Sequence, residues 1–150
     1  MTTIRSTTDI AASPSDVWGA LTDFASYERW NPFITHISGA LEPGQKLSVR
    51  IEPPDARPLS FTPTLLTVRS EDELRWLGRF LLPRIVDGEH VFRLEPTDEG
   101  TRLIQEETFS GLLVPLIRST IRKTQAGFEQ MNAALKQRVE RGDEAHDGRG

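Results

Sequence analysis

A regular apolar pattern near the C-terminus constrains the fold more than any other feature of the chain. Between residues 114 and 139, the positions that recur at intervals of three and four are Val114, Ile117, Ile121, Thr124, Phe128, Met131, Leu135 and Val139. This spacing predicts one long amphipathic helix over about 115–141. Such a helix could form a coiled-coil seam. We favour packing against a sheet, because the upstream sequence predicts a sheet whose apolar face needs a partner.

The segments before this helix have the features of short β-strands. Polar and apolar residues alternate over 2–12, and further candidate strands follow over 33–41, 46–53, 61–70, 73–80, 87–95 and 101–109. Turns rich in glycine, proline and acidic residues separate them. Short strands joined by short turns predict an antiparallel meander.

Two short helices are predicted between the first two strands. Ser13 is expected to be an N-cap residue, Pro14 suits the first helical position, and Asp16 lies near the positive end of the helix dipole. Asp23 is expected to cap the second helix, and Pro32 is expected to end it, because the residue before a proline avoids helical geometry.

Length and composition limit the classes of function. The 150 residues fit one domain over 1–141, and the polar segment 142–150 is expected to be a disordered tail. A net charge of -4 argues against nucleic-acid binding, which needs clustered Lys and Arg. Without cysteine there is neither a disulfide nor a thiolate metal ligand. No signal-peptide pattern and no apolar run of membrane-spanning length occurs, so we expect a cytoplasmic protein without a transmembrane segment.

One predicted hairpin, 88–111, mixes polar and apolar residues on the same face. That face carries His90, Phe92 and Leu94 on its first strand and Leu103, Gln105, Glu107 and Phe109 on its second. The favoured register sets His90 opposite Glu107, Phe92 opposite Gln105 and Leu94 opposite Leu103. A two-residue slip would instead set His90 opposite Gln105.

Three roles are open for these polar side chains. Buried polar groups need hydrogen bonds, so His90 and Glu107 could form a purely structural pair. They could instead orient the polar end of an apolar ligand, or one of them could act as a general acid or base on a bound carbonyl compound. Two candidate ligands are too few for a metal site, and no phosphate-binding or nucleotide motif occurs, so neither a metal nor a cofactor is expected.

Strand order predicts where a cavity would open. In a meander, alternate connections share one end, so the loops near 54–60, 81–86 and 110–114 are expected together, opposite the turns near 42–45, 71–72 and 97–100. The first group is longer and more apolar, so we place the mouth there, with 80–86 and 111–116 as candidate lids. The alternative is that these loops pack together as a plug. Within the long helix, Gly127 is expected to make room for a close sheet contact or for ligand volume.

Three stretches of the sequence are similar to those of a known family. "ASPSDVWGALTDFASYERWNPF" (12–33), "GEHVFRLEP" (88–96) and "GFEQMNAALKQRVE" (127–140) resemble the polyketide cyclase/dehydrase-like branch of the START/SRPBCC superfamily. The resemblance implies a helix-grip fold with a deep cavity between a curved sheet and the last helix. In relatives this cavity holds lipids, sterols, polyketides, quinones or plant hormones, and a minority of relatives catalyse cyclisation, aromatisation or dehydration.

We therefore expect an α+β helix-grip domain, with a curved antiparallel sheet of about seven strands wrapped around the C-terminal helix. It is expected to bind a small hydrophobic molecule through Trp30, Trp76, His90, Phe92, Leu94, Leu103, Gln105, Glu107, Phe109, Ile121, Phe128 and Met131. The first alternative is a polyketide cyclase or dehydratase that uses His90 and Glu107 as acid and base. The second is a protein-interaction module in which the cavity is vestigial.

Overall fold

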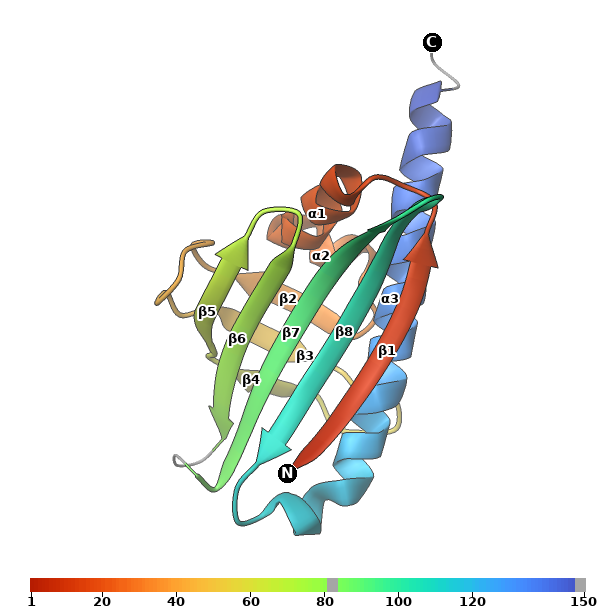
Figure 1. Ribbon diagram of the computed structural model, residues 1–150. Helices are drawn as coiled ribbons and strands as arrows, with labels where there is room; N and C mark the ends of the chain where they lie inside the picture. Colours follow the sequence, from red (N-terminus) through yellow and green to blue (C-terminus); the bar gives the residue numbers. More distant parts are fainter. Residues whose placement is uncertain (81–83, 148–150) are drawn as a thin grey trace.

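The computed structural model describes residues 1–80 and 84–147, and it has two antiparallel sheets beside one long helix (Figure 1). In chain order the elements are β1 (Thr2–Ile10), α1 (Pro14–Thr22), η1 (Phe24–Ser26), α2 (Tyr27–Trp30), β2 (Ile34–Ser38), β3 (Ser48–Ile51), β4 (Leu59–Phe61), β5 (Thr64–Arg69), β6 (Glu73–Phe80), β7 (Val86–Thr97), β8 (Gly100–Ser110), η2 (Val114–Ile117) and α3 (Arg118–Asp147). The larger sheet has the order β1-β8-β7-β6-β5, and the smaller has the order β2-β3-β4. The predicted α+β helix-grip fold is confirmed.

The strands differ from the prediction at one place. The expected strand over 61–70 corresponds to β5, whereas its first residue, Phe61, ends a separate strand, β4, that was not predicted and belongs to the other sheet. Pro63 lies between them and has no N–H to donate to a ladder, so the chain leaves the smaller sheet there and enters the larger one. Within the described residues the fold therefore has eight strands in two sheets, instead of about seven in one.

The N-terminal cap of α1 is as predicted, but the predicted cap of the second short helix is not observed. The Ser13 hydroxyl accepts a hydrogen bond from the Asp16 backbone N–H at 3.1 Å, and Pro14 occupies the first turn. The prediction that the Asp23 side chain caps a second helix is wrong, since that side chain makes no capping hydrogen bond. The Asp23 backbone carbonyl instead accepts from both the N–H and the hydroxyl of Ser26, which closes a 3-10 turn before α2.

The long helix α3 begins later and ends later than the sequence predicts. Residues Val114–Ile117 form the 3-10 turn η2, and α3 follows from Arg118 to Asp147, beyond the expected end at 141. The last part of the predicted tail, 148–150, lies outside the described residues. The domain boundary at residue 141 stays a prediction. Figure 1 shows α3 running alongside the edge strand β1.

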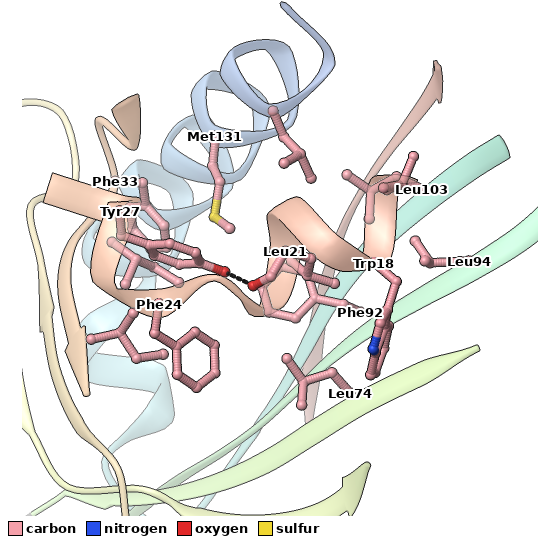
Figure 2. Close-up of a cluster of buried hydrophobic side chains, with 14 of the residues drawn as sticks. Trp18, Leu21, Phe24, Tyr27, Phe33, Leu74, Phe92, Leu94, Leu103 and Met131 are labelled. Atoms are coloured by element: carbon pink, nitrogen blue, oxygen red, sulfur yellow. Dashed lines mark hydrogen bonds between the residues drawn. The ribbon is translucent and has the colours of Figure 1, made fainter. Parts of the chain in front are cut away.

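The main core fills the half of the fold that lies nearest α1 and α2 (Figure 2). Leu21 and Tyr27 have no exposed surface, and they pack among the inward-facing side chains of the larger sheet. The Tyr27 hydroxyl donates a hydrogen bond to the Leu21 carbonyl, which satisfies the phenol inside the core. Burial raises the pKa of Tyr27, and the charge of Asp23 adds to this, so the phenol remains a donor. The two short helices thus close one end of the grip.

Candidate ligand-binding cavity

A cavity of about 970 Å³ lies between the two sheets and the start of α3. Side chains from both sheets and from α3 reach it, so it lies between the layers of the fold and is not a surface groove of one element. Its inner lining includes Phe33 just before β2, Ile34 at the start of β2, Ile51 at the end of β3, Trp76 on β6, His90 on β7, Glu107 and Phe109 on β8, and Thr124 on α3. These residues are mostly apolar, with one polar pair on the wall of the larger sheet.

The cavity lies at the end of the molecule that strand order predicts. Its outer lining includes the segment 53–62 together with Val86, Leu113 and Ile117. Two hydrogen bonds, each 3.1 Å long, join the loops at this end, from the Leu112 N–H to the Arg84 carbonyl and from the Leu113 N–H to the Ile85 carbonyl. The loops therefore do pack on each other, as the plug alternative expects, yet they leave the cavity between the layers. Residues 81–83 of the first candidate lid lie outside the described residues.

The polar pair on the wall has the predicted register. His90 pairs with Glu107, Phe92 with Gln105 and Leu94 with Leu103 across β7 and β8. The His90 ring then contacts both polar residues of β8. Its Nδ1 lies 3.2 Å from Glu107 Oε1, and its Nε2 lies 3.0 Å from Gln105 Oε1. From the sequence, the favoured register placed Glu107 opposite His90, and the slipped register placed Gln105 there. The observed register is the favoured one, and it brings both side chains within hydrogen-bond distance of His90.

The hydrogen bonds continue from His90 across the interior to the long helix. Gln105 Nε2 donates to Asn132 Oδ1 at 2.8 Å, and Asn132 Nδ2 donates to the backbone carbonyl of Ser6 on β1 at 3.3 Å. Gln105 and Asn132 have no exposed surface. Asn132 was missed in the sequence, although a signal was present, because it lies one residue after Met131 and three before Leu135 on the predicted buried face.

Aromatic rings hold the His90 imidazole on its other sides. The Trp76 ring stacks on it with centroids 4.9 Å apart, and Phe92 and Phe128 contact it at 4.7 and 4.9 Å. Gly88, two residues before His90, lies beside the Glu107 carboxyl group, and a Cβ there would lie 3.4 Å from its carboxyl carbon, which is an ordinary contact distance. The polar pair therefore has a fixed orientation within an otherwise apolar wall.

Only some of the predicted contact residues lie on the cavity wall. Trp76, His90, Glu107 and Phe109 line it. The others belong to the packed interior: Phe92, Leu94, Leu103, Phe128 and Met131 lie in the main core, Gln105 lies behind His90, and Ile121 packs with Phe109 and Val114. The core position of the first set has a physical reason, because α1 and α2 occupy that half of the grip (Figure 2).

Trp30, which the sequence predicts as a ligand contact, is not among the residues that line the cavity. Its ring packs against Tyr27, with centroids 5.1 Å apart, and Arg138 of α3 lies over it at 6.0 Å. The Trp30 indole N–H donates to the Ser26 hydroxyl at 3.3 Å. This cluster of side chains packs against the main core.

The smaller sheet supplies cavity residues that the sequence did not reveal. Phe61 on β4 and Phe80 on β6 have ring centroids 5.0 Å apart, and both line the cavity where the two sheets meet. Arg57, Arg79 and Lys123 add positive charge to the lining. A signal for Phe61 was its alternation with neighbouring residues, but assigning it to this wall needs the second sheet, which appears only in three dimensions.

Two further features of the described residues bear on function. No group of three or more His, Cys, Asp or Glu side chains in residues 1–80 and 84–147 is arranged to hold a metal ion. Within the same residues, no helix combines the length and the hydropathy needed to cross a membrane.

Residues 1–140 match the family described as polyketide cyclase / dehydrase and lipid transport. No curated protein gave a match. Among solved structures, protein MLL2253 from Mesorhizobium loti is 21% identical with a TM-score of 0.74, and the match covers 93% of this chain and 98% of that one.

Two further solved structures come from biosynthetic systems. DynU16, from the dynemicin biosynthetic locus, is 23% identical with a TM-score of 0.69, and the match covers 93% of this chain and 48% of that one. The di-domain ARO/CYC StfQ of the steffimycin pathway is 13% identical with a TM-score of 0.66, and the match covers 92% and 51%. At these identities the structures show the fold alone. The family match spans nearly the whole chain and agrees with the resemblance seen in the sequence. The chain therefore belongs to the polyketide cyclase / dehydrase and lipid transport family.

Proposed function

We propose that this protein binds a small, mostly apolar molecule in the cavity between the sheets and α3. The observation that carries the proposal is a cavity of about 970 Å³ with apolar walls and one buried polar pair on its lining. Sites for small molecules usually measure about 300–1,000 Å³ and combine apolar walls with a few fixed polar groups. The family description, which names lipid transport, supports the same class of ligand.

Native mass spectrometry of protein purified from its host tests this proposal. We expect a population that carries an additional non-covalent mass, which organic extraction releases as a hydrophobic compound. Thr120 lines the cavity from an exposed position on α3, so Thr120→Trp should fill space without disturbing the core. Ser119→Trp, at the neighbouring exposed position, is the matched control and should retain the bound compound.

The masses found for wild type, Thr120→Trp and Ser119→Trp decide whether the proposal holds. Repeated spectra of the unbound protein alone, together with no binding of added apolar dyes, would contradict it. Retention of the compound in Thr120→Trp at the level of Ser119→Trp would move the binding site away from this cavity.

An enzyme of the cyclase or dehydratase type is the second candidate, and the His90–Glu107 contact on the cavity wall favours it. A carboxyl group next to an apolar cavity could move a proton to or from a bound β-hydroxyketone as water is lost. The test follows dehydration of such a ketone by mass spectrometry with wild type and Glu107→Gln. A dehydratase would lose turnover in the variant while its fold persists, and equal turnover would exclude the acid–base role.

A third possibility, an interaction module with a vestigial cavity, has less support. A cavity of about 970 Å³ lies within the size range of small-molecule sites, which favours ligand binding over an interaction role.

A further inference from the structure

We infer that the buried hydrogen bonds behind the cavity turn a bare carboxyl oxygen of Glu107 toward the ligand, so that the cavity selects apolar molecules carrying a hydroxyl or similar hydrogen-bond donor. The inference rests on the proposed binding function and narrows it to a class of ligand. It follows from the atoms that can donate and accept along one chain of contacts, from Ser6 on β1 to Glu107 on β8.

The chain of contacts starts at an atom that can only accept. The backbone carbonyl oxygen of Ser6 lies 3.3 Å from the side chain of Asn132, so the amide nitrogen of Asn132 must face it. The Asn132 carbonyl oxygen therefore points the other way, where it accepts from Gln105 Nε2 at 2.8 Å. The orientation of both amides is thus fixed by the backbone of β1.

The same logic fixes the hydrogen on one nitrogen of His90. With its amide nitrogen directed at Asn132, Gln105 presents its carbonyl oxygen to His90 Nε2 at 3.0 Å. This oxygen can only accept, so Nε2 must carry a hydrogen. Gln105 and Asn132 have no exposed surface, so water cannot reach these hydrogen bonds and take the place of either side chain.

The contact on the opposite side of the ring then requires a shared proton. When Nε2 is protonated, a neutral imidazole has a bare Nδ1, and a bare nitrogen cannot bond to a bare carboxylate oxygen. The 3.2 Å contact between Nδ1 and Glu107 Oε1 therefore contains a proton, which belongs either to the ring or to the carboxyl group. In both arrangements the second carboxyl oxygen, Oε2, has no hydrogen.

Glu107 is the member of the pair that can touch a ligand. Both His90 nitrogens are occupied by protein partners, and 4% of the His90 side chain is exposed. Glu107 lines the cavity with 11% of its side chain exposed, and within the described residues no hydrogen bond reaches its Oε2. His90 is therefore a positioning residue. The Oε2 atom can accept a hydrogen bond from an O–H or N–H group of a ligand. It cannot form a hydrogen bond with an ether or a ketone of the same shape, because these groups have no hydrogen to donate.

The selectivity can be measured with two probes of one shape. Nile red, an uncharged dye that fluoresces in apolar surroundings, reports occupancy, and β-naphthol and its methyl ether compete for the site. We expect the naphthol to displace the dye at about tenfold lower concentration than the ether, because only the naphthol can donate to Oε2. In Glu107→Leu the two competitors should become equal to within about twofold.

Glu106→Leu is the matched control, because Glu106 is the neighbouring residue on the opposite face of β8 and pairs with Arg5 at 3.7 Å. It should keep the tenfold preference. If the dye fails to bind at all, the proposed function fails. If dye and competitors bind but the naphthol and the ether are equal in wild type, or if Glu107→Leu keeps the preference, binding stands and the donor selectivity is overturned.

A measurement without any ligand tests the hydrogen-bond argument separately. Nitrogen NMR of the histidine rings distinguishes a protonated from a bare ring nitrogen, and a His90→Gln sample assigns the His90 signals. We expect Nε2 to be protonated. A neutral His90 ring with its hydrogen on Nδ1 and a bare Nε2 would overturn the inference, whatever the result with the dye.

Discussion

A missing side chain on α3 lets the smaller sheet approach the helix. A Cβ built at Gly127 would lie 2.3 Å from Cδ1 of Phe33, so the Phe33 ring rests directly against the helix backbone. Phe128 holds this ring from the side, with centroids 5.6 Å apart. Of the two expectations for Gly127, a close contact or ligand volume, the structure shows a contact, and its partner is the residue just before β2.

Gly127→Ala should therefore destabilise the protein although alanine favours helices. The helix gains about 1 kcal/mol from the substitution, but overpacking of a held aromatic ring costs about 1–3 kcal/mol. We expect a net loss of about 1 kcal/mol in the free energy of unfolding, measured by urea denaturation. Gly19→Ala is the control, because a Cβ at this exposed position of α1 meets nothing within 4 Å, and it should be neutral or stabilising. A stabilised Gly127→Ala would contradict the packing described for Phe33.

Glu73 lies among arginines on the outer face of the larger sheet. Burial by itself would raise the pKa of this carboxyl group, but hydrogen bonds from Arg75 and Arg93, with the charges of Arg75 and Arg69, hold the pKa below its ordinary value. Because the pKa is lower in the folded state, ionised Glu73 stabilises the protein above its unfolded pKa. This contribution is lost as the pH falls through the folded pKa.

Glu73→Gln should reveal this contribution as a pH-dependent difference. We expect the variant to be less stable than wild type by about 1–2 kcal/mol near pH 7, and the difference should shrink below about pH 4.5 as the carboxyl of the wild type becomes protonated. Urea denaturation across this pH range measures it. Glu71→Gln, at an exposed turn position, should show no such difference. A constant difference at every pH would exclude the ionic origin.

At the scale of elements, α3 protects the open edge of the larger sheet. β1 is an edge strand, and its outer backbone groups bond to side chains of the helix instead of to another strand. Gln125 accepts from the Arg5 N–H at 3.0 Å and donates to the Arg5 carbonyl at 2.7 Å, and Lys136 donates to the Asp9 carbonyl at 2.9 Å. An uncovered edge of this kind is a template for aggregation.

Gln125→Ala should weaken this protection more than it weakens the helix. Loss of the two bonds to Arg5 should lower the free energy of unfolding by about 1 kcal/mol, although alanine is the better helix former. The exposed edge should also raise the rate of aggregation, which light scattering can follow. Gln130→Ala, at an exposed position of the same helix, is the matched control and should change neither property. Equal behaviour of the two variants would contradict the edge-protecting role.

The elements differ in how far the sequence predicts them. The β7–β8 register was predictable, because a tight polar turn and a clear two-residue period leave few pairings. The split between β4 and β5 was not, although Pro63 marked the place. A proline at the end of a strand is compatible with either a bulge or a change of sheet, and only long-range pairing decides between them.

At the scale of the whole molecule, the position of the cavity was predictable and most of its walls were not. Strand order places the longer loops at one end without any knowledge of packing. The wall residues depend on how deeply α1 and α2 enter the grip, which is a long-range property. Leu94 and Leu103 alternate on their strands just as His90 and Glu107 do, yet they lie in the core because these helices cover them.

Binding in the cavity should stabilise the whole fold. A ligand that binds only the folded state, present at about 100 times its dissociation constant, adds about 2.7 kcal/mol to the free energy of unfolding. For a chain of this length the thermal midpoint should then rise by about 5–10 °C with a saturating apolar ligand, measured by calorimetry. Thr120→Trp should show no increase, and an equal increase in that variant would place the bound molecule elsewhere.

The core formed by α1 and α2 also has a consequence for the proposed binding site. No side chain of α1 or α2 is among the residues that line the cavity, yet these helices lie at its inner end and should limit the length of the proposed ligand. Leu21 and Tyr27 set that limit from a single short stretch of the chain. Substitutions at Leu21 and Tyr27 should therefore change the length of the proposed ligand that fits, without altering the His90–Glu107 pair on the wall.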